Sequence, residues 1–315
     1  MHRVLTFLCV AITLCAPAMG AQFSFAAFGD TPYNADEEPQ LVAMIGEMNR
    51  EPLAFIVHVG DFKDSRSECS DKTFTQRRDW FALSHHPLFF TPGDNDWVDC
   101  TRARWAPRQP LERLDKLRAL FFSRDSSLGQ RSLPATRQSA RGYPENMRWR
   151  IADTLFATLN IPGPDNNRTR LHAEAARRTP ALLDWMSQAF SIAREQKLPA
   201  IVLAMQANLW TGNPGYSDIL AALADEAQRY DGEVLVIHGD THWFRFDAPL
   251  VDPRSGKRID NVTRIEVYGS PFVNWVHVTV TNANGSARFT AIPGSQIVSR
   301  RDAGGTRIGE PREGR

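Results

Sequence analysis

Four predicted β-strands of this chain end in the same dipeptide, Gly-Asp. The dipeptides lie at residues 29–30, 60–61, 93–94 and 239–240, each directly after a run of apolar residues. Glycine lets the backbone turn sharply where a strand ends, and the aspartate is then presented beyond the sheet. If these strands share a sheet, the carboxylates converge, and a cluster of anions is costly unless cations neutralise it. The pattern therefore predicts a metal site rather than four unrelated turns.

The order of the predicted elements supports this arrangement. Apolar runs at 23–28, 54–59 and 88–91 predict strands, and a helix is predicted at 41–48. Strands alternating with helices are typical of a sheet with parallel strands, whose sites form beyond the carboxyl ends. From residue 264 onward, alternating strands with a turn at Asn284-Gly285 predict a second, antiparallel sheet. We also predict strands at 154–161, 200–205 and 234–237 and helices at 111–122, 171–196 and 217–230.

The first twenty residues have the layout of a secretory signal peptide. A charged start precedes an apolar run from Val4 to Ala16, and small residues lie before a cleavage point after Gly20. The run is shorter than the ~20 apolar residues that a membrane-spanning helix needs. A buried N-terminal helix is the alternative. We therefore expect a secreted or periplasmic protein without a stable membrane anchor.

One domain is expected over residues 21–293, with 1–20 as the signal peptide. Residues 100–150 are irregular and Arg-rich apart from one helix, and we interpret them as an insertion that covers the sheet or shapes the cleft. Residues 294–315 are rich in Gly, Arg and Ser and predict a disordered tail. Lys and Arg number 37 and Asp and Glu 36, so no basic field indicates a nucleic-acid partner.

Two cysteines, Cys69 and Cys100, remain after the predicted cleavage. An extracytoplasmic compartment permits a disulfide, so we predict that the two are joined; two separate buried thiols are the alternative. The bridge would stabilise the fold by about 3 kcal/mol. Cys69 lies eight residues beyond Asp61, and Cys100 lies six residues beyond Asp94. The disulfide would therefore brace two loops that carry predicted metal ligands.

The Gly-Asp segments resemble the sequence blocks of the calcineurin-like metallophosphoesterases, which run D-x-H, G-D-x-x-D/Y, G-N-H-D/E, a lone His, and G-H-x-H. The resemblance covers residues 23 to about 246 and keeps the order of the blocks. It implies a four-layer α/β/β/α sandwich with two facing mixed β-sheets. The corresponding segments are Asp30-Thr31-Pro32-Tyr33, Gly60-Asp61-Phe62-Lys63-Asp64, Gly93-Asp94-Asn95-Asp96, Met205-Gln206-Ala207-Asn208 and Gly239-Asp240-Thr241-His242.

The resemblance also implies two divalent metal ions. Relative to the family, the ligands shift from nitrogen toward oxygen donors, which favours Mn²⁺, Mg²⁺, Fe or Ca²⁺ over Zn²⁺. Pro32 stands where the first block has a histidine, and Tyr33 and His238 rank behind the other residues as ligands. The implied ligands are Asp30, Asp61 and His242 for one ion and Asp61, Asp94, Gln206 and Asp240 for the other.

Asn95 stands where the family carries a catalytic histidine. Asparagine can donate a hydrogen bond but cannot exchange a proton. Asn95 and Asp96 are the predicted catalytic residues, and Asn95 and Asn167 the predicted substrate contacts, although turn chemistry alone also explains Asn167.

The function implied by the resemblance is hydrolysis of a phosphoester. A hydroxide bridging the two metal ions would attack a small phosphorylated substrate. Because several family histidines are replaced, the second hypothesis is a catalytically silent extracytoplasmic binding protein that keeps the phosphoesterase scaffold. A third hypothesis places a single ion on the side of His242.

Overall fold

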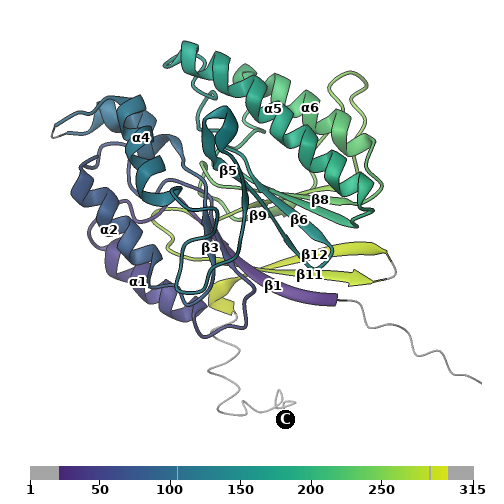
Figure 1. Cartoon of the computed structure of the whole chain (residues 1–315), viewed down its shortest axis with the longest axis horizontal. Coiled ribbons are helices and arrows are strands. Elements are labelled where there is room, and N and C mark those ends of the chain that lie inside the picture. Colours follow the sequence, from purple (N-terminus) through teal and green to yellow (C-terminus); the bar gives the residue numbers. More distant parts are fainter. Residues whose placement is uncertain (1–20, 105, 284, 297–315) are drawn as a thin grey trace, which may run out of the picture.

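Two β-sheets with helices on their outer faces make up the fold, in a computed structural model that describes residues 21–104, 106–283 and 285–296 (Figure 1). The first sheet has the strand order β12 (Ser286–Pro293), β11 (Val276–Ala283), β1 (Ala21–Phe28), β2 (Ile56–His58), β3 (Leu88–Phe90). The second has the order β4 (Thr136–Gln138), β5 (Tyr143–Ile151), β6 (Thr154–Thr158), β7 (Ala200–Ala204), β8 (Glu233–His238), β10 (Val262–Glu266), β9 (Arg245–Asp247).

The helices divide between the two outer faces, which confirms the predicted four-layer α/β/β/α sandwich with two mixed sheets (Figure 1). One group packs with the first sheet and consists of α1 (Glu37–Met48), α2 (Asp71–Phe81) and α4 (Pro110–Phe121). The other group covers the second sheet and consists of α5 (His172–Glu195) and α6 (Ser217–Gln228). Two short segments, α3 (Asp94–Trp97) and the 3₁₀ turn η1 (Val98–Arg102), follow β3.

Aromatic side chains fill the space between the sheets. Phe156 of β6 meets Phe25 and Phe55 edge to face, with ring centroids 5.5 and 4.9 Å apart. Its neighbours Leu155 and Ala157 point the other way and join the core under α5 and α6. The second sheet is therefore buried on both faces, which explains why its central strands are almost continuously apolar in the sequence.

The late strands correct one prediction. Instead of forming an antiparallel sheet of their own, β11 and β12 are a hairpin that extends the first sheet, with β11 antiparallel to β1. Strand β10 lies in the second sheet, parallel to β8. Pairing with β1 buries the alternate residues Val276, Val278 and Val280 in the shared core, which a separate two-stranded sheet could not do.

The segment 100–150 is more regular than predicted. Besides α4 it contains β5, which pairs antiparallel with β6 and places Trp149 in the core between the sheets. Helix α2 is the crossover helix expected between the second and third strands, but its bounds were not predicted, because its sequence is mostly polar and only a narrow face that includes Phe74 and Phe81 is buried. Contacts with segments that are distant in the sequence stabilise both elements, and neither has a strong local sequence pattern.

Predictions for the two ends of the chain fall largely outside the described residues. The signal peptide (1–20) and positions 297–315 of the predicted tail lie there, whereas residues 294–296 are described and form a short helical turn. The amide of Gly294 donates to the carbonyl of Trp275 (2.7 Å). Within the described ranges, no helix is both long and apolar enough to cross a membrane.

The predicted disulfide between Cys69 and Cys100 is confirmed. Both cysteines are buried, and their Cα atoms are 5.5 Å apart. Cys69 directly precedes Ser70, the N-cap of α2, and Cys100 lies in η1. The bridge thus links the segment after Asp61 to the segment after Asp94.

Removing this disulfide should weaken the fold. A Cys69→Ala/Cys100→Ala protein is expected to lose about 3 kcal/mol of unfolding free energy, because the unfolded chain regains the freedom of a loop with a sequence separation of 31 residues. Denaturant titration of both proteins measures the difference. An unchanged midpoint and slope would contradict the prediction.

Candidate metal centre

The carboxyl ends of strands from both sheets meet at one site. Asp30 follows β1, Asp61 follows β2, and Asp240 and His242 follow β8. The backbone amide of Asp240 donates to both carboxylate oxygens of Asp30, each at 3.1 Å. The carboxylate of Asp61 accepts from Gln206, which follows β7, at 3.1 Å. Residues predicted from separate sequence blocks are therefore brought into one cluster.

The backbone at this cluster is unusual. Asp30, Asp61, Asp240 and His242 have φ angles of 51°, 59°, 76° and 66°, in the left-handed region that residues with a side chain rarely adopt. Such conformations cost of order 1–3 kcal/mol each and persist where surrounding contacts impose them, most often at functional sites. Their concentration at four predicted ligands supports a functional centre.

The glycine of two Gly-Asp dipeptides makes room for a carboxylate from another strand. A Cβ atom on Gly239 would overlap the Asp30 carboxylate, and a Cβ on Gly93 would overlap the Asp61 carboxylate. Any larger residue at these positions would displace a predicted ligand. This close approach gives the repeated dipeptide a physical reason beyond the turn itself.

Burial and mutual repulsion make the carboxylates reluctant to ionise. Burial, and next the charge of Asp240, raise the pKa of Asp30 well above its usual value. Burial and the charge of Asp94 do the same to Asp61, and burial, together with the charge of Asp240, raises the pKa of Asp94 to about 8. A divalent cation would replace protons in such a cluster, because it stabilises the ionised carboxylates.

The donor chemistry fits a divalent ion. Carboxylate oxygens with one imidazole suit Mn²⁺, Mg²⁺ or Fe. Among the described residues, no three or more His, Cys, Asp and Glu side chains are oriented so that they could hold one ion. The carboxylates instead accept hydrogen bonds from nearby backbone and amide groups.

His242 and Tyr33 border the same carboxylates. The Nδ1 atom of His242 lies 2.8 Å from the carbonyl oxygen of Ser270, a contact that requires an N–H at Nδ1, and Nε2 lies 3.7 Å from Asp30. The Tyr33 hydroxyl donates to Asp61 (3.2 Å) and accepts from the Asn95 amide (3.0 Å). Burial, and next the charge of Asp61, raise the pKa of Tyr33, so its phenol stays neutral and acts as a donor.

Gln206 departs from its predicted role as an oxygen ligand. Its Oε1 accepts from the backbone amide of Gly163 (2.7 Å), and its Nε2 donates to Asp61 and to Asp240 (3.4 Å). The N–H of Gly163 fixes this orientation, since only an oxygen can accept from it. Gln206 therefore presents its amide nitrogen, and not the predicted oxygen, to the carboxylates in this structure.

No model of a known protein family and no curated protein matches the sequence. The structure, however, is similar to a purple acid phosphatase from yellow lupin seeds, with a TM-score of 0.53 and 13% identity over 89% of this chain and 53% of that chain. The chain has the metallophosphoesterase fold. It spans about half the length of the lupin enzyme.

Two further solved structures are similar at lower scores. PhoD has a TM-score of 0.49 and 13% identity, with 87% of this chain and 69% of that chain covered. The NAD nucleotidase of Haemophilus influenzae has a TM-score of 0.45 and 12% identity, with 87% and 50% covered. At 13% identity, the similarity to the lupin enzyme shows the fold alone, and the chemistry has to be argued from the residues of the site.

Asp96 anchors two loops of this metallophosphoesterase fold. Its fully buried carboxylate accepts from the backbone amides of Gly93 (2.8 Å), Asp61 (2.9 Å) and Phe62 (2.9 Å). Burial is the main reason that its pKa is raised to about 6. The carboxylate therefore holds the loops after β2 and β3 together, and the catalytic role of Asp96 stays a prediction.

Two other predicted site residues lie inside the protein. Asn167, a predicted substrate contact, is fully buried, and its amide donates to Glu174 (3.5 Å). His238 is also fully buried, with Nδ1 2.8 Å from the carbonyl oxygen of Gly239. Burial lowers its pKa to about 3, which keeps the ring neutral in the core next to Trp210. Its second-rank assignment as a ligand is not supported.

Sequence reasoning missed one residue that contacts the site and one long-range ion pair. Ser270, which orients His242, lies in Gly269-Ser270-Pro271 soon after β10, a strand-ending glycine pattern that could have found it. Arg170 forms an ion pair with the buried Asp99, 71 residues away in the sequence. No local pattern signals a contact at that separation.

The metal-free protein should become less stable as the pH rises above about 6.5. A carboxyl group whose folded pKa is raised, such as Asp94 (about 8, from 3.8), stabilises the fold below its unfolded pKa, and this contribution is lost as the pH rises through the folded value. The buried His58 and His238 have pKa values lowered from 6.5 to about 3. They make the stability increase with pH, but only below about pH 6.5.

Thermal unfolding with a chelator or with excess Mn²⁺, at three pH values between about 6.5 and 8.5, measures this effect. The increase in Tm on adding the ion is expected to grow with pH, because the ion replaces protons on the carboxylates. An increase that stays constant over this range would contradict the prediction.

Proposed function

We propose that this chain is a metal-dependent phosphoester hydrolase that acts outside the cytoplasm on small phosphorylated substrates. The observation that carries the proposal is the convergence of Asp30, Asp61, Asp240 and His242 at strand ends of a metallophosphoesterase fold. The disulfide fits an oxidising compartment, in agreement with the predicted signal peptide.

Two sets of side chains would hold the ions. Asp30, Asp61 and His242 form one set, and Asp61, Asp94 and Asp240 the other. Divalent ions bound there would offset the charge of the carboxylates, polarise a phosphoryl group and supply a nucleophile near neutral pH. Gln206 contributes hydrogen bonds to the second set in place of a metal bond.

The residues around Asn95 set the range of substrates in this proposal. The backbone amide of Asn95 is fixed by Asp61 (2.9 Å), and its side-chain amide donates to Tyr33. The second N–H of the side-chain amide can donate to a phosphoryl oxygen, but asparagine cannot protonate a leaving group. The enzyme should therefore prefer esters with acidic alcohols, such as aryl phosphates, over alkyl phosphates.

A metal analysis combined with a panel of aryl phosphates tests the proposal. The purified protein is assayed for bound metal and for hydrolysis of mono- and diesters with leaving groups of graded pKa, with Mn²⁺, Mg²⁺ or chelator. We expect bound or acquirable divalent metal and rates that fall steeply as the leaving-group pKa rises. Absence of both metal binding and hydrolysis would overturn the proposal.

The alternative is a binding protein without catalysis. The amide nitrogen of Gln206 favours it, because this group hydrogen-bonds two carboxylates that would otherwise serve a second ion. Saturable binding of inorganic phosphate without turnover of any ester in the panel would select this alternative.

A further inference from the structure

The loop of residues 162–171 runs along the candidate metal centre. At one end, the amide of Gly163 donates to Gln206. At the other end, the guanidinium of Arg170 pairs with the carboxylate of Asp99 and donates to the carbonyl of Val98 (3.3 Å). Val98 and Asp99 belong to η1, which directly continues the α3 segment that carries Asp94 and Asn95.

Asp99 holds Arg170 close to the carboxylate cluster. The side chain of Asp99 is only 2% exposed, and it also accepts from Arg102 (3.0 Å). Asp99 lies five residues after Asp94 on the continuous α3–η1 segment, and its charge contributes, after burial and the charge of Asp240, to the raised pKa of Asp94. A cation paired with Asp99 is therefore attached to the segment that carries Asp94 and Asn95.

The guanidinium of Arg170 retains capacity for another anion. Its side chain is 29% exposed, although its partner is almost fully buried. The guanidinium carries five N–H donors in a planar fork, and Nη1 and Nη2 each make one contact with η1. The remaining donors match the oxygens of a phosphoryl group, which a guanidinium binds well because the hydrogen bonds are charge-assisted.

We propose that Arg170, held in place by Asp99, binds the phosphoryl group of the substrate at the edge of the metal centre. It supplies the positive charge that the neutral amide of Asn95 cannot. The inference rests on the proposed function and adds to it a substrate-binding residue that the sequence blocks do not contain.

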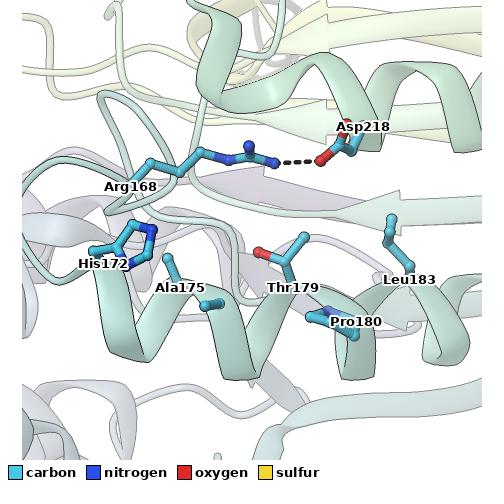
Figure 2. Close-up of a pocket in the computed structure, with 8 residues that line it drawn as sticks. Arg168, His172, Ala175, Thr179, Pro180, Leu183 and Asp218 are labelled. Carbon is cyan, nitrogen blue, oxygen red and sulfur yellow. Dashed lines mark hydrogen bonds and ion pairs between the residues drawn. The ribbon is translucent and has the colours of Figure 1, made fainter.

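Arg168 provides a matched control on the same loop. Figure 2 shows its side chain reaching across the groove between α5 and α6 to Asp218, above His172 and Thr179. Arg168 and Arg170 are the same residue type on the same loop, but Arg168 pairs with Asp218 whereas Arg170 pairs with Asp99. Arg168→Gln should therefore leave phosphate binding unchanged.

The test compares wild type, Arg170→Gln, Arg170→Lys and Arg168→Gln, each loaded with Mn²⁺. Calorimetric titration gives the Kd of inorganic phosphate, steady-state assays give kcat/KM for an aryl phosphate, and metal content and Tm are measured in parallel. Arg170→Gln is expected to weaken phosphate binding by about 10- to 100-fold, the range for a lost charged hydrogen bond, at unchanged metal content. Arg170→Lys keeps the positive charge but not the planar set of N–H donors, so its phosphate Kd should lie between those of wild type and Arg170→Gln.

The outcomes separate this inference from the proposed function. If wild type hydrolyses the ester and Arg170→Gln binds phosphate as tightly as Arg168→Gln, the role of Arg170 is overturned and the proposed function stands. If phosphate binding depends on Arg170 but no ester is hydrolysed, the anion site stands and the hydrolase proposal fails. If Arg170→Gln unfolds, Arg170→Lys decides: wild-type affinity together with wild-type kcat/KM would overturn the inference.

Discussion

Replacing Asp61 by asparagine is expected to lower kcat/KM for an aryl phosphate by about 1000-fold or more and to reduce the bound metal. Asp61 belongs to both proposed ligand sets, and its carboxylate lies between Gln206 and the Tyr33 hydroxyl. A neutral amide removes one negative charge from that position. Metal ions contribute several kcal/mol of transition-state stabilisation, and each 1.4 kcal/mol is a factor of ten in rate.

Asparagine keeps the shape of the side chain, so its oxygen can still accept from the backbone amide of Asn95. Metal content is measured by mass spectrometry of the purified variants, and Asp260→Asn serves as the control because the Asp260 side chain is 86% exposed on the surface. Wild-type metal content and rate in Asp61→Asn would show that the carboxylate cluster is not the active centre.

Replacing Arg178 by methionine is expected to cost about 3–5 kcal/mol of unfolding free energy. Arg178 is fully buried and donates to Glu174 at 2.6 and 3.1 Å, to the Asn160 carbonyl at 2.9 Å, and to the side chain and carbonyl of Asn166 at 2.6 and 3.1 Å. Methionine would leave the Glu174 carboxylate, itself 8% exposed, without its cation in the interior.

The neighbouring Arg177 is exposed on the same helix, so Arg177→Met is the matched control and should stay within about 0.5 kcal/mol of wild type. Adding Glu174→Leu to Arg178→Met should recover much of the loss, because replacing both partners removes the unpaired charge. Equal denaturation midpoints for the Arg177 and Arg178 variants would contradict this account.

The sequence predicted the strands that carry the Gly-Asp dipeptides better than it predicted β5 and the late strands. Parallel strands place their carboxyl ends together, so the four Gly-Asp dipeptides were enough to bring Asp30, Asp61 and Asp240 to one site. Strand β5 was missed because Arg148 and Arg150 interrupt its apolar residues, and the apolar Trp149 between them packs between the sheets. The partition of the late strands depends on long-range pairing that periodicity does not encode.

Roles of individual side chains were harder to predict than their positions. The orientation of Gln206 is set by the amide of Gly163, 43 residues away, and the pairing of Arg170 with Asp99 spans 71 residues. Such contacts depend on how loops from different elements meet. Residue type at a motif position therefore located the site, whereas tertiary hydrogen bonds decided which atom each residue presents.

The space that Gly239 leaves for Asp30 has a consequence for assembly. Asp30 ends a strand of the first sheet and Gly239 follows a strand of the second, so the carboxylate of one layer is inserted into the backbone of the other. The centre therefore comes into existence only when the two layers have docked in their final register. An ion bound there would cross-link the two sheets. A shift of one sheet relative to the other would then require the ion to dissociate first.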